Sequence, residues 1–220
     1  MRLRDHIGIS RSTQRAVTRL MELTLVGLLF VGLYQLDVGI VVNAGAGLLV
    51  TQLPPVLERD YDIQMDAGLT LWITAAAFLH AIGTAGLPGM SRNLYVAIPW
   101  WDHVTHTLSA SLVAAAGYTT VRALDLHRED IYLPPNYTFV FVLAFVLAFG
   151  VLWEVLEFFI GLAAQFVGGD PVLTQFGIED TMVDLVFDAL GGIVVATWGQ
   201  VYLSDVVGSI RRQFERDAAE

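Results

Sequence analysis

The sequence predicts an all-α polytopic membrane protein, a bundle of six transmembrane helices with both termini in the cytoplasm. Hydrophobic residues make up 55% of the 220 residues and charged residues only 15%, with a mean hydropathy of +0.60. This is too little charge to cover the surface of a soluble domain. Several apolar runs reach about 20 residues, which is enough to cross about 30 Å of hydrocarbon. We therefore predict one integral membrane domain over residues 1–220 and no separate soluble domain.

The apolar runs define the predicted spans. Asp37 alone separates the first two runs, which predicts a tight hairpin, and Pro54 and Pro55 are a strong turn signal. Residues 1–19 are basic and polar and are predicted to form a cytoplasmic N-terminal segment, and residues 204–220 a cytoplasmic C-terminal tail. In chain order, the predicted spans are Leu20–Leu36, Val38–Leu57, Leu69–Leu87, Asp102–Leu124, Tyr137–Val167 and Asp180–Leu203.

The orientation follows from the arginines, because cytoplasmic loops carry an excess of basic residues. The chain has no lysine, so all 12 basic residues are arginine. With the N-terminus inside, only Arg92 lies outside, and Trp100 and Trp101 fall at the outer membrane interface, where indole rings are favoured. The arginines then placed inside are Arg2, Arg4, Arg11, Arg15, Arg19, Arg59, Arg122, Arg128, Arg211, Arg212 and Arg216. The predicted location is the cell membrane.

Acidic residues outnumber basic residues in this chain. Acidic residues number 22, which gives a net charge of -10. An acidic, lysine-free protein is typical of the high-salt cytoplasm of halophilic archaea, and a GC-rich coding bias is the alternative explanation. Cysteine is absent, which excludes a disulfide framework and thiolate chemistry. The predicted partner is the lipid bilayer, and no nucleic acid is expected.

Ionisable residues interrupt four of the predicted spans. Glu154 and Glu157 are spaced i,i+3 and share one helix face, and the aspartates of the last span form an i,i+4,i+8 row. Because alternate spans run in opposite directions, all these residues are expected at similar depth in the outer half of the membrane. The complete set is His80, Asp102, His103, His106, Glu154, Glu157, Asp180, Asp184 and Asp188.

Carboxylates in such a bundle need compensation, because each charge at the bilayer centre costs about 2.5–3.5 kcal/mol. The spans offer no arginine or lysine at this depth. The carboxylates therefore hold metal cations, or are protonated and relay protons, or line a water-filled vestibule. Bundles build divalent-metal sites from histidine and carboxylate side chains on facing helices. The predicted metal ligands are His80, Asp102, His103, His106, Glu157, Asp180 and Asp184, and the ion is Mg, Mn, Ca, Fe or Zn.

A metal site would suit a membrane hydrolase that acts on a lipid or a phosphate ester, with Glu154 or Asp188 as the general base. The alternatives are a cation- or proton-coupled transporter and a non-catalytic membrane scaffold. Simpler structural roles also compete. Asp102 and Asp180 could each be a helix N-cap, and His80 could be a hydrogen-bonded core histidine.

The order of these motifs resembles the YjdF-like family of uncharacterised prokaryotic inner-membrane proteins. The similarity implies that His80, Asp102, His106, Glu154, Glu157, Asp180 and Asp184 form a shared polar centre. At His103 that family tends to carry arginine, so this chain departs from the pattern there. The family brings no established activity. The motifs that carry the resemblance are FLHAIG (Phe78–Gly83), LYVAIPWWDHVTHTLSA (Leu94–Ala110), LWEVLEF (Leu152–Phe158) and DTMVDLVFDALGG (Asp180–Gly192).

Reporter fusions test the predicted orientation. A reporter that is active only outside the membrane should be active when fused after Gly89 or Gly169, and inactive when fused after Glu129 or at the C-terminus. The arginine distribution is the reason for this expectation. An active external reporter at the C-terminus would overturn the predicted topology.

Overall fold

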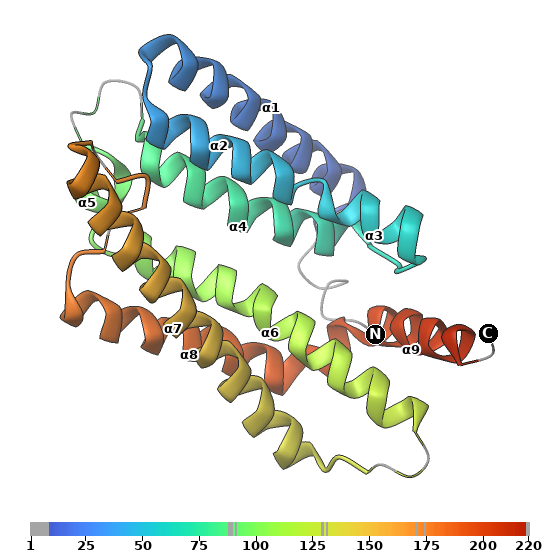
Figure 1. Ribbon diagram of the computed structural model, residues 1–220. Helices are drawn as coiled ribbons and strands as arrows, with labels where there is room; N and C mark the ends of the chain where they lie inside the picture. The colour runs from blue at the N-terminus through green and yellow to red at the C-terminus, as the bar shows by residue number, and fades with distance from the viewer. Residues whose placement is uncertain are drawn as a thin grey trace.

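The computed structural model describes residues 9–87, 90, 92–128, 130, 132–169, 171–173 and 175–218. Arg2, Arg4, Gly89 and Glu129, which entered the topology prediction, lie outside these residues. Every regular element within them is a helix, and the long helices form two layers (Figure 1). The helices are α1 (Arg11–Gln35), α2 (Val38–Val50), α3 (Leu53–Tyr61), α4 (Ala67–Ala85), α5 (Leu94–Ala97), α6 (Trp101–His127), α7 (Pro135–Val167), α8 (Ile178–Tyr202) and α9 (Ser204–Asp217).

The first layer contains α1, α2 and α4, which all pack against one another. The α1 helix begins well before the predicted span, because Ser10 is its N-cap and the Ser10 hydroxyl accepts a hydrogen bond from the Thr13 amide at 3.1 Å. Leu36 then adopts a left-handed conformation with φ 58, and the Asp37 carboxylate caps α2 by accepting from the Ile40 amide at 3.0 Å. The predicted tight hairpin at Asp37 is therefore present.

The second predicted span is not one continuous helix. It divides into α2 and α3, with a break at Thr51 and Gln52. Pro54 and Pro55 lack the amide hydrogens that an uninterrupted helix would need there, and α3 instead carries proline in its first turn, where no such donor is required. The combined segment Val38–Tyr61 still has the length and apolarity to cross a membrane.

The second layer contains α6, α7 and α8, with α9 packed against α6. Small and branched side chains from these helices form the buried core, which includes Ala114, Val142 and Val195. The segment predicted as a C-terminal tail, residues 204–220, contains the helix α9. Its Val207 is buried in the core, and an ion pair of 2.6 Å joins Arg216 to Asp62 beyond the end of α3. The Arg216 guanidinium lowers the pKa of the exposed Asp62 carboxyl.

Among the described residues, five segments are long and apolar enough to cross a membrane, and α6 is not one of them. The predicted span Asp102–Leu124 does form a single helix, α6, but hydroxyl-bearing residues such as Thr105, Ser111 and Thr119 lower its apolarity. These side chains are buried inside the bundle and bond to carbonyls of their own helix. A central helix that contacts protein on most sides does not need a continuous apolar surface.

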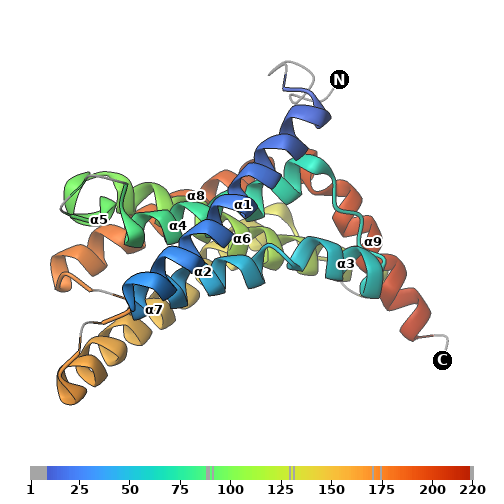
Figure 2. The ribbon, with the colours of Figure 1, turned by 90° about the horizontal axis from the view of Figure 1, so that it is seen from above.

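The long helices alternate in direction, so each end of the bundle gathers residues from distant parts of the sequence. One end holds α5, the start of α6 and the start of α8, and the other holds α3 and α9 (Figures 1 and 2). The starts of α1 and α7 lie at the same end as α3 and α9 (Figure 1). We call the two ends of the bundle the α5 end and the α9 end.

The two most extensively packed helices, α6 and α8, approach each other closely at Gly191. A β-carbon at Gly191 would collide with the Thr107 carbonyl oxygen and lie 3.0 Å from the Ser111 amide nitrogen, both on the α6 backbone. Glycine therefore lets the two backbones touch, as small residues do between membrane helices. A β-carbon at Gly161, in contrast, would meet nothing within 4 Å.

This contrast gives a matched pair of substitutions. Gly191→Ala should lower stability by roughly 1–3 kcal/mol, because α6 and α8 must move apart. Gly161→Ala should be neutral or stabilising by up to about 1 kcal/mol, because alanine has the higher helix propensity. Thermal unfolding in detergent, followed by tryptophan fluorescence, measures both. Equal melting temperatures for the two variants would contradict the close approach at Gly191.

Candidate metal centre

Ionisable residues of three helices gather at the α5 end of the bundle. Asp102 and His106 lie in the first two turns of α6, Asp184 and Asp188 lie in the first half of α8, and Glu154 and Glu157 lie in the second half of α7. Electrostatic interactions connect Asp102 to His106, Glu154 and Asp180. We call the set Asp102, His106, Glu154, Glu157, Asp180, Asp184 and Asp188 the His/carboxylate cluster.

His106 lies at the centre of this cluster, between three aspartates from two helices. Its Nδ1 is 3.1 Å from Asp188 Oδ1, and its Nε2 is 3.6 Å from Asp102 Oδ1 and 4.0 Å from Asp184 Oδ2. The imidazole therefore presents one ring nitrogen to Asp188 and the other to the space shared by Asp102 and Asp184. This division of the two ring nitrogens sets the chemistry that the histidine can perform.

The face of His106 that carries Nε2 has the spacing of a metal site. One ligand atom each from Asp102, His106 and Asp184 lies within 4.8 Å of the other two. Two ligands of one divalent ion, each at about 2.0–2.2 Å from it, lie about 3 to 4.4 Å apart. The measured separations of 3.6 and 4.0 Å from His106 Nε2 fall in that range. Asp184 is buried and the other two side chains are partly buried.

Asp188 occupies the position of an orienting residue. In the tautomer that donates from Nδ1, His106 bonds to Asp188 and leaves the Nε2 lone pair free for a cation. Carboxylates commonly hold metal-binding histidines in this way. Gly150 on α7 makes room for the arrangement, because a β-carbon there would collide with the Asp188 carboxylate.

The two α7 carboxylates have partners that the sequence did not indicate. Glu154 Oε2 accepts hydrogen bonds from the Thr181 hydroxyl at 2.7 Å and the Gln175 amide at 3.4 Å. Glu157 Oε1 accepts from the Trp153 indole at 2.9 Å. Thr181 and Gln175 could not be identified in advance, because neither residue type signals ligation and Gln175 precedes α8 in a loop.

Two carboxylate oxygens of the cluster are buried with no hydrogen-bond partner in the described part of the chain. They are Glu154 Oε1 and Asp184 Oδ1. Glu154 is 4% exposed and Asp184 is 2% exposed. Burying a polar group without a partner is costly, so such atoms call for an explanation such as an ion, a water molecule or a proton.

Three of the residues predicted as ligands make other contacts. His80 Nδ1 is 2.9 Å from the Tyr95 hydroxyl. This contact agrees with the alternative role of His80 as a hydrogen-bonded core histidine. His103 stacks on Phe187, with ring centroids 4.2 Å apart. Asp180 accepts a hydrogen bond from the Phe176 amide at 3.1 Å. None of the three belongs to the group with ligand spacing among the described residues.

The N-cap interpretation of Asp102 and Asp180 is wrong. The N-cap positions of α6 and α8 are Trp100 and Gly177, and neither makes a side-chain cap. Both aspartates lie inside the first helical turn instead. A carboxylate there still benefits from the positive end of the helix dipole.

The fold and the cluster define a helical membrane protein with a buried His/carboxylate centre. Residues 16–205 match the family described as "Predicted membrane protein (DUF2238)", and the chain belongs to this family. An uncharacterised protein of Thermotoga maritima is 28% identical over 149 residues, which cover 65% of this chain and 67% of the relative. No solved structure matches the chain. The motifs that resemble YjdF-like proteins lie within the matched residues.

The bond between Thr181 and Glu154 can be tested with an isosteric change. Thr181→Val removes the hydroxyl donor from a buried carboxylate and should cost about 1–3 kcal/mol of stability. Thr197→Val on the same helix is the control, because the exposed Thr197 hydroxyl bonds only to carbonyls of its own helix. That change should stay within about 0.5 kcal/mol. If thermal unfolding in detergent gives equal losses, the Thr181–Glu154 bond contributes nothing specific.

Proposed function

We propose that this protein crosses the membrane six times, with both termini in the cytoplasm and the His/carboxylate cluster in the outer half of the bilayer. The α9 end would be the cytoplasmic end. The arginine distribution supports this orientation, because Arg92 stands alone in the loop before α5, at the other end. In this arrangement α6 crosses the membrane in addition to the five apolar segments, and α4, α7 and α8 pack around it.

We propose further that the cluster binds a divalent cation through Asp102, His106 and Asp184. The observation that carries this proposal is the His106 side chain, with Nδ1 directed to Asp188 and Nε2 directed to two carboxylates. The unpartnered Asp184 Oδ1 and Glu154 Oε1 support it, because a nearby cation would compensate both. No arginine pairs with these carboxylates in the described part of the chain, so a cation is the missing positive charge.

Carboxylate-rich ligands with a single histidine suit Mg, Mn, Ca or Fe, and the histidine also allows Zn. Two further carboxylates, Glu157 and Asp180, lie close enough to interact electrostatically with members of this group. They would raise the affinity for a cation by adding negative charge around it. His80 and His103 would not be ligands, because Tyr95 and Phe187 already hold them in other contacts.

The function that this site would support best is hydrolysis of a lipid or a phosphate ester. A bound divalent ion supplies Lewis acidity to such a reaction. Glu154 fits the general base, because Thr181 and Gln175 hold one of its oxygens and leave Oε1 available to take a proton. Asp188 fits the orienting role better than the role of base, because its carboxylate is already engaged by His106.

Metal binding is tested by stability and by elemental analysis. Saturating Mn, Mg or Zn should raise the melting temperature of chelator-treated protein, by about 2.7 kcal/mol of stabilisation at 100 times the dissociation constant. The corresponding shift is about 5–10 °C for a chain of this size. Asp184→Asn should abolish the shift and the bound metal, and Glu157→Ala should reduce the shift by weakening the affinity for the ion.

Glu179→Gln is the matched control for Asp184→Asn. Glu179 is an exposed carboxylate in the first turn of the same helix, outside the cluster, so this variant should bind metal as the wild type does. Protein purified without chelator that contains no stoichiometric metal, and that no divalent ion stabilises, would refute the metal site. It would leave proton or cation movement, or a structural polar network, as the role of the cluster.

Hydrolysis is tested with the metal-loaded protein in nanodiscs of defined phospholipids, with released products followed by mass spectrometry. Glu154→Gln should keep the metal-dependent melting shift and lose product formation by about 100-fold or more, the usual contribution of a general base. Metal binding without any product would separate the two parts of the proposal, keeping the metal site and rejecting hydrolysis of the lipids tested.

A further inference from the structure

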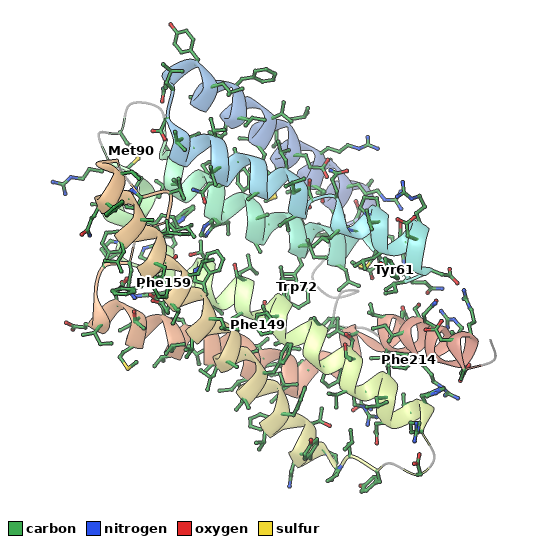
Figure 3. All side chains as sticks on the ribbon, in the orientation of Figure 1. Tyr61, Trp72, Met90, Phe149, Phe159 and Phe214 are labelled. Carbon is green, nitrogen blue, oxygen red and sulfur yellow. The ribbon has the colours of Figure 1, made fainter. Side chains whose placement is uncertain are left out.

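A cavity is lined by residues of α6 and α8 that do not belong to the His/carboxylate cluster. It is a groove of about 1310 Å³ between the start of α4 and helices α6 and α8, and Trp72 points from α4 into this space (Figure 3). Its walls are mainly apolar, with Leu108 on α6 and Val194 and Val195 on α8. Gly191 and Gly199 also line it.

The groove is separate from the candidate metal centre. His103 and Thr107 line it, whereas Asp102 and His106 lie on the neighbouring face of α6 and do not. The His103 ring, stacked on Phe187 at 4.2 Å, forms the wall at the α5 end. This contact accounts for the position of His103, which the metal centre does not use.

The groove is long and open to the surface. Its lining residues on α8 run from Phe187 to Tyr202, which corresponds to about 22 Å of helix. That length covers much of the roughly 30 Å of bilayer hydrocarbon. Val194 and Trp198 on its rim are 46% and 56% exposed. In a protein that spans the bilayer, such a surface contacts lipid chains.

At the α9 end the groove joins a smaller, polar chamber of about 320 Å³. Arg11, Asp66 and Tyr202 line both cavities, and Arg15, Glu58 and Asp205 line the chamber. Asp66 accepts hydrogen bonds from the first amides of α4, so its carboxylate already has partners. No ion pair joins Arg11 or Arg15 to a carboxylate within the described ranges.

We propose that this pair of cavities binds one membrane phospholipid, with an acyl chain in the groove and the phosphate between Arg11 and Arg15. In the apolar groove, the acyl chain would contact protein side chains instead of the chains of neighbouring lipids. The two guanidinium groups offer a phosphate paired, charge-assisted hydrogen bonds. Because Glu58, Asp66 and Asp205 line the same chamber, an additional negative charge on the headgroup is not favoured, and a zwitterionic phospholipid suits the site. This proposal does not depend on metal binding or on hydrolysis.

Native mass spectrometry tests the proposal with protein released from nanodiscs of phosphatidylcholine. Wild-type protein should retain one phospholipid. The double variant Arg11→Gln/Arg15→Gln should lose most of this retention, because the phosphate loses its charge-assisted hydrogen bonds. Arg19→Gln, one turn further along α1 and outside both cavities, should keep it.

A second pair of variants addresses the groove itself. Val194→Trp fills the groove and should abolish lipid retention, whereas Val186→Trp changes another exposed valine of α8 outside the groove and should not. Circular dichroism and gel filtration verify that each variant is folded. Equal lipid retention by these two valine variants, or unchanged retention by the double arginine variant, would overturn the proposal. Dimers without retained lipid would overturn it also and assign the groove to a second copy of the chain.

Discussion

The close approach of α6 and α8 is the constraint on which the rest of the structure depends. Gly191 lets the α8 backbone reach the α6 backbone beside Thr107 and Ser111. That contact sets the register of the two helices, so that Asp184 and Asp188 arrive next to His106 on one side of the pair. The same glycine is one of the residues that line the apolar groove. A larger residue would separate the helices and disturb both features.

The His/carboxylate cluster shows how a bundle accommodates acidic groups without arginine or lysine. Hydrogen bonds from Thr181, Gln175, Trp153 and His106 satisfy part of the carboxylate oxygens. Two buried oxygens remain without partners among the described residues. A partly satisfied buried network is unfavourable unless another species completes it. The arrangement around His106, open on its Nε2 side and tied to Asp188 on its Nδ1 side, indicates where that species would bind.

Much of the fold was predictable because long apolar helices follow from hydropathy alone. The observed limits of α4, α6, α7 and α8 lie within about three residues of the predicted spans, inside the usual uncertainty of helix ends. The break between α2 and α3 and the additional helices α5 and α9 were not predicted. The helix α5 is only one turn long, and α9 carries its apolar residues on one face, so neither produces a long apolar run.

The sequence by itself determined which residues are unusual and on which helix faces they lie, because helical spacing and topology are local or periodic properties. It placed acidic groups and histidines at one end of the bundle and assigned His80, His103 and His106 together as metal ligands, while it left a core role open for His80. Only the tertiary structure decided that His106 meets Asp102, Asp184 and Asp188, whereas His80 meets Tyr95 and His103 meets Phe187. Those partners come from segments far apart in the chain, and their contacts depend on how closely the helices pack and how each is rotated about its axis.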